Sequence, residues 1–148
     1  MFLNCHTAFS FKYGTLQVED LFNEAQRCGV KKLVLTEINN TASYIELLRL
    51  CKEKQPIDES GLNRFGKPGY ALDIALGIEF RKEDNLLYVA IAKNNDGFEE
   101  MNRFLSYHNI RDIALPELAP EWKDVFVVYP FGKREPEQLR PNEYIGIR

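Results

Sequence analysis

The sequence of 148 residues is poor in the residues that build metal clusters and disulfide frameworks. Its three cysteines, Cys5, Cys28 and Cys51, are widely spaced and form no C-x-x-C pair, which argues against a disulfide framework and against a zinc cluster. Only two histidines are present, His6 and His108, so a three-histidine site is excluded. We interpret the cysteines as reduced, which predicts a cytoplasmic protein.

Long apolar runs and an excess of basic residues are also absent. The N-terminus lacks the basic and apolar regions of a signal peptide, and the apolar stretch 70–80 is interrupted by Asp73, so we expect no membrane partner. Nineteen Lys and Arg against 22 Asp and Glu give a net charge of −3, which disfavours direct contact with nucleic acid. With 45% apolar and 28% charged residues, the composition is that of a packed globular domain.

Short apolar runs alternate with amphipathic segments along the chain. The run 33–36, bounded by polar residues, is typical of a strand buried on both faces. The alternation predicts an α/β protein with mostly parallel strands. The predicted strands are 2–5, 32–36, 72–80, 86–92, 125–129 and 143–147, and helices are predicted over 18–28, from a cap at Asn40 to Cys51, and from Asp96 to His108. The charged turn 81–85 separates the third and fourth strands, which could form a hairpin.

Local signals define these helices further. In the second helix, we expect Asn40 to be the N-cap, and the buried stripe to consist of Tyr44, Leu47, Leu48 and Cys51. In the third, D-G-F-E at 96–99 predicts a capping box in which the Asp96 side chain accepts from the amide three residues later.

Two segments bear on the domain organisation. Residues 56–69 are rich in turn formers and predict a loop excursion from a single domain spanning 1–148. After the last predicted strand the sequence has neither a further helix nor a polar tail. We therefore expect the chain to be the N-terminal portion of something larger.

Three polar residues lie where parallel α/β proteins place functional groups, at the carboxyl ends of strands. His6 follows the first strand, Glu37 follows the run 33–36, and Glu79 lies near the end of 72–80. If they converge, one imidazole and two carboxylates could hold a divalent cation. The same residues would equally arise as a loop imidazole bonded to backbone and as solvated strand ends, and these alternatives stay open.

Four segments, in order along the chain, resemble the successive motifs of the PHP (polymerase and histidinol phosphatase) domain. They are L-N-C-H-T-A-F-S at 3–10 followed by Gly14, L-V-L-T-E-I-N-N at 33–40, G-I-E at 77–79 and A-K-N-N-D-G-F at 92–98. The last segment is similar to the A-K-N-x-x-G-[FY] motif of PHP domains at the N-terminus of bacterial DNA polymerase III alpha subunits. The likeness covers roughly residues 2–107.

The resemblance implies a distorted (β/α)7 barrel, present here in part, and divalent metals in intact family members. Against the family pattern H-x-H-[ST], Asn4 occupies the first histidine position and leaves His6. Against L-T-D-H-G, Glu37 replaces the aspartate and Ile38 the histidine, while Tyr13 stands where an aspartate is usual. We therefore expect no catalytic residue and no cofactor in this chain. The vestigial metal-site positions are Asn4, His6, Tyr13, Glu37, Ile38 and Glu79, of which His6, Glu37 and Glu79 are weak candidate ligands.

The resemblance also implies a role in DNA replication, as a structural or partner-docking domain of a DNA-directed DNA polymerase, a nucleotidyltransferase whose polymerase site would lie downstream. The implied partners are the remainder of the polymerase alpha subunit and the proofreading exonuclease subunit. One alternative is a small stand-alone metal-dependent phosphoesterase, in which His6, Glu37 and Glu79 bind the ion that activates water. Another is an α/β interaction domain with no inherited site.

Overall fold

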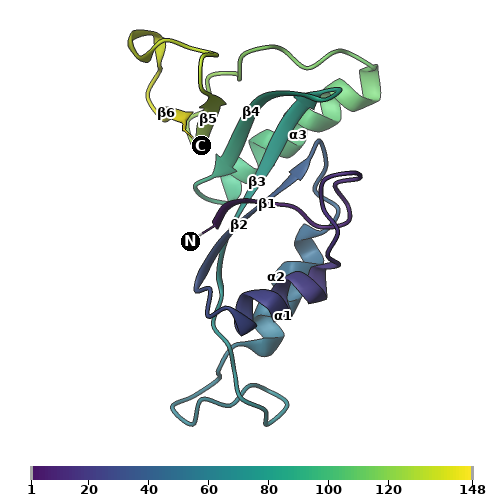
Figure 1. The fold of residues 1–148 in the computed structure, drawn as a ribbon, viewed down its shortest axis with the longest axis vertical. Coiled ribbons are helices and arrows are strands. Elements are labelled where there is room, and N and C mark those ends of the chain that lie inside the picture. Colours follow the sequence, from purple (N-terminus) through teal and green to yellow (C-terminus); the bar gives the residue numbers. More distant parts are fainter. Residues whose placement is uncertain (1, 148) are drawn as a thin grey trace. The chain divides into compact units, whose positions relative to one another are not determined.

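A computed structural model describes residues 2–147 as a mixed α/β protein (Figure 1). The chain forms two compact units, one containing the residues up to Glu37 together with Ala42–Ile74, and the other Ile38–Thr41 together with the residues from Ala75 onward. The elements are β1 (Phe2–Cys5), α1 (Val18–Arg27), β2 (Lys32–Ile38), α2 (Tyr44–Lys54), β3 (Asp73–Lys82), β4 (Asn85–Ala92), α3 (Asn95–Arg111), β5 (Val125–Pro130), a 3₁₀ turn (Pro136–Gln138) and β6 (Glu143–Gly146).

In the first unit, β1 and β2 pair in parallel, with Cys5 opposite Leu35. Helices α1 and α2 pack against each other (Figure 1). The core is formed by apolar side chains from both helices and from β2, among them Phe22, Leu35 and Leu47 with no exposed area. Five consecutive residues of β2 are buried, which confirms the prediction that this strand is covered on both faces.

Helix α2 differs from its predicted form. It begins at Tyr44 after Ser43, whereas Asn40 lies in the preceding turn and donates its side-chain amide to the Ile38 carbonyl at 3.0 Å. Leu50 is buried, whereas Leu48 is 41% exposed and Cys51 is only half-buried. The buried positions therefore follow a spacing of three, a narrower stripe than the predicted one.

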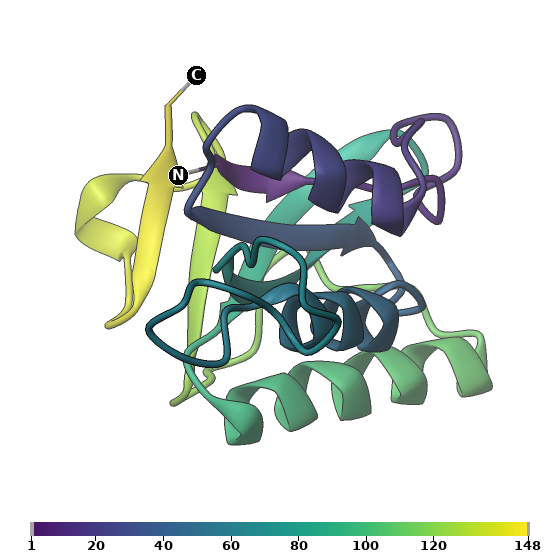
Figure 2. The same cartoon turned by 90° about the horizontal axis from the view of Figure 1, so that it is seen from below.

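In the second unit, the prediction of mostly parallel strands is only partly confirmed. Strands β3 and β4 form an antiparallel hairpin, β4 and β5 are antiparallel, and β5 and β6 are parallel, as Figure 2 shows for the last pair. The turn between β3 and β4 has two residues, Glu83 and Asp84, and a connection this short can join only antiparallel neighbours.

The core of the second unit lies between α3 and the sheet. Met101 and Leu105 of α3 pack with side chains of β3, β4 and β5. An aromatic cluster extends this core, with Phe80 at ring-centroid distances of 5.0 Å from Tyr88 and 5.6 Å from Phe104. Such pairs add about 1 kcal/mol each beyond the burial of their area.

The start of α3 corrects the predicted capping box. Asn94 is the N-cap, and its side-chain oxygen accepts from the Gly97 amide at 2.9 Å, so Asp96 lies inside the first turn. A Cβ atom at Gly97 would lie 2.0 Å from the Asp124 carbonyl oxygen. The amide of Lys93 also donates to that oxygen, at 2.9 Å. The segment 92–98 is therefore a junction between β4, α3 and the approach to β5.

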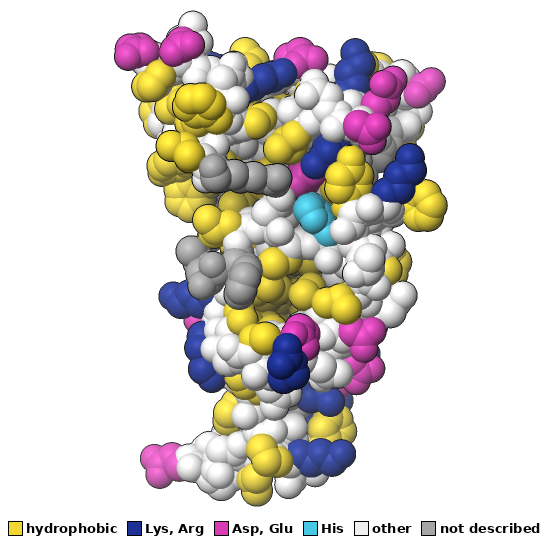
Figure 3. Space-filling view, in the orientation of Figure 1, with side chains coloured by type: hydrophobic (Ala, Val, Ile, Leu, Met, Phe, Trp, Pro, Cys, Tyr) yellow, Lys and Arg dark blue, Asp and Glu magenta, His cyan; other side chains and the backbone are white. Residues whose placement is uncertain are grey.

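The surface mixes apolar and charged side chains (Figure 3). Phe11 and Ile110 are each 84% exposed, and Phe131 is 79% exposed. Within residues 2–147, no helix is long and apolar enough to cross a membrane.

Candidate functional site

Glu37 is a fully buried carboxylate in β2 that accepts hydrogen bonds from neutral donors. Its Oε1 accepts from the Thr7 amide at 3.1 Å, from the Thr7 hydroxyl, and from the Ser43 hydroxyl at 2.6 Å. Its Oε2 accepts from the Ser10 hydroxyl and from the Thr7 amide at 3.3 Å. Several donors to one buried carboxylate offset the cost of removing it from water. We call Thr7, Ser10, Ser43 and Glu37 the hydroxyl cage.

The cage depends on a tight loop between β1 and α1. The amides of Tyr13 and Gly14 both donate to the Ser10 carbonyl, at 3.0 and 2.9 Å. A Cβ atom at Gly14 would lie 1.8 Å from the Thr7 carbonyl oxygen, so only glycine fits there. This close approach holds Thr7 and Ser10 where both reach Glu37.

The amide of Glu37 connects the cage to the first residue of α2. It donates to the Tyr44 hydroxyl at 3.2 Å. Burial raises the pKa of Tyr44 above its ordinary value, so the hydroxyl stays protonated at neutral pH. The cage therefore joins β2, the loop after β1 and the start of α2.

The other predicted positions of the first unit lie on β1 and the loop after it. Asn4 accepts from the Thr36 hydroxyl at 2.5 Å through its side-chain oxygen. His6 is half-buried, and Tyr13 is 42% exposed in the loop. Burial raises the pKa of the Cys5 thiol, which makes it a poor nucleophile or metal ligand at neutral pH.

Glu79 lies in the second unit, on β3, and is also fully buried. It forms an ion pair with the Nε of Arg81, two residues further along the same strand. Arg81 also donates from its Nη1 to the Asp84 carbonyl at 2.9 Å. Ile38, at the end of β2, is half-buried, and its side chain has no atom that can bind a metal.

Asn39 fixes the backbone around this ion pair. Its amide donates to the Glu79 carbonyl at 3.1 Å, and its side chain exchanges two hydrogen bonds with the Arg81 backbone, at 2.8 and 2.9 Å. Asn39 has a φ of 51°, a left-handed conformation that asparagine tolerates better than most residues. Its side chain therefore pairs with β3 as a strand backbone would.

The burial of both carboxylates contradicts the interpretation of Glu37 and Glu79 as solvated strand ends. Each carboxylate has protein donors within its own unit. Within the described range 2–147, no set of three or more His, Cys, Asp or Glu side chains is placed to hold a metal ion.

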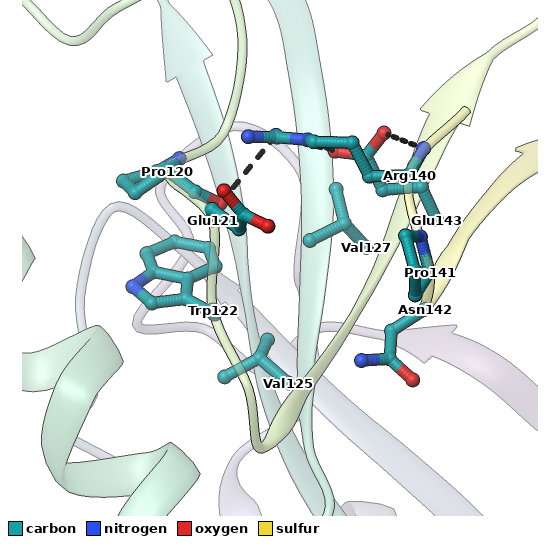
Figure 4. Close-up of a pocket in the computed structure, with 9 residues that line it drawn as sticks. All are labelled: Pro120, Glu121, Trp122, Val125, Val127, Arg140, Pro141, Asn142 and Glu143. Atoms are coloured by element: carbon teal, nitrogen blue, oxygen red, sulfur yellow. Dashed lines mark hydrogen bonds and ion pairs between the residues drawn. The ribbon is translucent and has the colours of Figure 1, made fainter. Parts of the chain in front are cut away.

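A small pocket beside β5 and β6 was not predicted from the sequence (Figure 4). The Arg140 guanidinium spans it, donating to Glu143 Oε1 at 2.8 Å and to the Ala119 carbonyl. The Tyr129 hydroxyl also donates to Glu143, at 3.1 Å. These groups are one another's hydrogen-bond partners. Together they connect the segment that precedes β5 to strand β6. The pocket is lined by Pro120, Glu121, Trp122, Val125, Val127, Arg140, Pro141, Asn142 and Glu143.

Comparisons with known proteins confirm the family resemblance seen in the sequence. A family model described as PHP domain matches residues 3–128. Proteins called DNA polymerase III subunit alpha, from Neisseria meningitidis serogroup A (serotype 4A) and serogroup B, are each 24% identical over 123 residues, which is 81% of this chain. The chain spans about a tenth of the length of these relatives.

Proposed function

Because the chain belongs to the PHP domain family, we propose that it forms the N-terminal part of a replicative DNA polymerase III alpha subunit. Its role there is to build and dock the polymerase rather than to hydrolyse phosphoesters. The observation that carries this proposal is the similarity to DNA polymerase III subunit alpha over most of the chain. In this proposal, the two units belong to a partial (β/α)7 barrel of the PHP type.

The structural role is supported by the environment of the two carboxylates. A phosphoesterase of this kind needs carboxylates and imidazoles whose lone pairs are open to metal ions. In this chain, Glu37 accepts from the other three residues of the hydroxyl cage, and Glu79 is paired with Arg81. Both carboxylates hold the fold together in the present arrangement, which favours a scaffold over a hydrolase.

The partners follow from the proposal. The remainder of the alpha subunit would supply the polymerase site, and the proofreading exonuclease subunit would dock on the assembled polymerase in the cytoplasm. With a net charge of −3, the chain itself is not expected to bind the DNA backbone.

An antibody raised against the chain tests the assignment in cells of the source organism. We expect it to detect a polypeptide about ten times as long, because the chain covers 10% of its relatives, and to deplete primer-extension activity from an extract. Pre-immune serum is the control. A short product whose removal leaves primer extension unchanged would contradict the proposal.

Hydrolysis of an aryl phosphate with added Mn²⁺ or Zn²⁺ distinguishes the phosphoesterase alternative. We expect no turnover by the purified chain. Turnover that His6→Ala abolishes would instead support the hydrolase, because His6 is the one histidine among the three candidate ligands.

A further inference from the structure

Glu79 and Arg81 place opposite charges on one face of β3. Residues two apart in a strand point to the same side, so the Arg81 side chain reaches Glu79 without any turn of the chain. The Glu79 side chain is fully buried, and the Arg81 side chain is 12% exposed. An isolated buried carboxylate would cost several kcal/mol, and a guanidinium at this position offsets that cost.

Arg81 is held in place by more than the ion pair. Its backbone is fixed by the two hydrogen bonds with Asn39, and its Nη1 by the Asp84 carbonyl. The register between β3 and β4 also shifts between Phe80 and Arg81. The extra residue is Leu87 of β4, which lies between Tyr88 and Leu86, the partners of Phe80 and Arg81. Strand β3 itself therefore keeps the alternation that puts Glu79 and Arg81 on one face.

We propose that the Arg81 guanidinium is a built-in counter-cation for Glu79, which makes the fold of the second unit independent of divalent metal. The residues present do not fit the metal that the family implies. A metal at Glu79 Oε1 would displace the guanidinium and leave a nearly buried positive charge without this carboxylate. This inference concerns the buried ion pair and does not require the polymerase assignment.

Thermal unfolding of the whole chain tests the proposal. With EDTA, Mn²⁺ or Zn²⁺, we expect the wild-type Tm to stay within about 1 °C. Arg81→Met keeps the apolar stem but removes the charge, and we expect it to lower the Tm by roughly 10 °C.

Two further variants separate charge compensation from a general loss of folding. Glu79→Gln combined with Arg81→Met removes both charges, and we expect it to recover at least about half of the lost Tm. The matched control is Arg103→Met, since Arg103 is 80% exposed and pairs with Glu99 on the surface of α3, and we expect a change of less than about 2 °C.

Three results would overturn the proposal. One is a wild-type Tm that rises by several degrees with Mn²⁺ or Zn²⁺. Another is an Arg81→Met variant as stable as Arg103→Met. The third is a double variant that is no more stable than Arg81→Met, or that fails to fold when Arg81→Met fails, because the loss would then not come from an unbalanced charge.

Discussion

The carboxylate of Glu37 accepts both the amide and the hydroxyl of Thr7, a residue thirty positions earlier in the chain. Ser10 and Ser43 contribute their hydroxyls to the same carboxylate. One buried acidic group thus fixes two loops relative to β2. In the sequence, Glu37 is a candidate metal ligand. In the folded first unit, its hydrogen-bond partners are protein groups that hold the fold together.

Replacing this carboxylate should weaken the first unit. Glu37→Gln keeps the shape but puts an NH₂ group where an oxygen accepts, so we expect a loss of about 2 kcal/mol in the free energy of unfolding. Ser43→Ala removes one donor, at 2.6 Å, and should cost about 1 kcal/mol. Urea unfolding measures both. The control is Glu100→Gln on the exposed face of α3, and equal stability of Glu37→Gln and Glu100→Gln would show that the cage contributes nothing.

Two alanine variants distinguish the observed cap of α3 from the predicted one. Asn94→Ala removes the bond to the Gly97 amide and should cost about 1 kcal/mol. Asp96→Ala removes only a negative charge in the first turn, which stabilises the helix by interacting with its dipole, and should cost about 0.5 kcal/mol. Chemical denaturation compares the two. A larger loss for Asp96→Ala would restore Asp96 as the cap.

Gly97→Ala should destabilise the protein although alanine is the better helix former. In an open helix the change would gain about 1 kcal/mol. Here the new Cβ would lie 2.0 Å from the Asp124 carbonyl oxygen, so we expect a net loss of roughly 1–3 kcal/mol. Circular dichroism on heating measures it. Ser106→Ala, exposed in the same helix, is the control, and a Gly97→Ala protein of equal or higher Tm would contradict the close approach.

Glu143 should make stability depend on pH in the acid range. Burial raises the pKa of Glu143, but the hydrogen bonds from Arg140 and Tyr129 outweigh burial and hold the pKa below its ordinary value of 4.5. A pKa depressed by folding contributes stability that is present above pH 4.5 and is lost as the pH falls through the folded-state pKa.

The variant Glu143→Gln isolates this contribution. We expect it to be less stable than the wild type by about 2 kcal/mol at pH 7, and the difference to shrink as the pH falls through the folded-state pKa, below 4.5. Urea unfolding between pH 7 and pH 3 measures the difference. A difference that stays constant over this range would mean that Glu143 ionisation is not coupled to folding.

The segment 56–69 should exchange its amides faster than the core strands. It contains no helix or strand of regular length, and its hydrogen bonds are those of local turns, such as the Ile57 amide to the Leu62 carbonyl at 2.9 Å. Most of its side chains are exposed, so these bonds have little buried apolar packing around them. Asn63 is only 4% exposed, so we expect its amide to exchange most slowly within the segment. Hydrogen exchange by mass spectrometry tests this, and protection equal to that of β4 throughout would contradict the excursion.

The positions of the strands could be predicted because each is a short apolar run between polar residues, as 33–36 illustrates. The direction of pairing was predicted only in part: the short charged turn 81–85 pointed to the hairpin of β3 and β4, whereas the antiparallel pairing of β4 with β5 follows a long connection through α3 and has no such signal. Helix starts were misplaced at Asn40 and Asp96, since several neighbouring polar residues could cap equally well.

The candidate site was predicted in part. The sequence singled out Glu37 and Glu79, which are acidic residues at the ends of apolar runs. It could not reveal the hydroxyl cage, because Thr7 and Ser43 meet Glu37 only through tertiary structure. Arg81, placed by the sequence in a charged turn, is two residues from Glu79, and that spacing on an extended strand was the available signal.

The hydrogen bonds between Asn39 and β3 also limit where the chain can be cut to produce a folded fragment. The four residues Ile38–Thr41 belong to the second unit although the chain on both sides of them belongs to the first. A truncation after Ile74 would therefore remove the Glu79 and Arg81 backbone groups that Asn39 binds. A fragment starting at Ala75 would lack Asn39 itself. Neither unit is a contiguous stretch of polypeptide, so neither can be excised whole by choosing one cut.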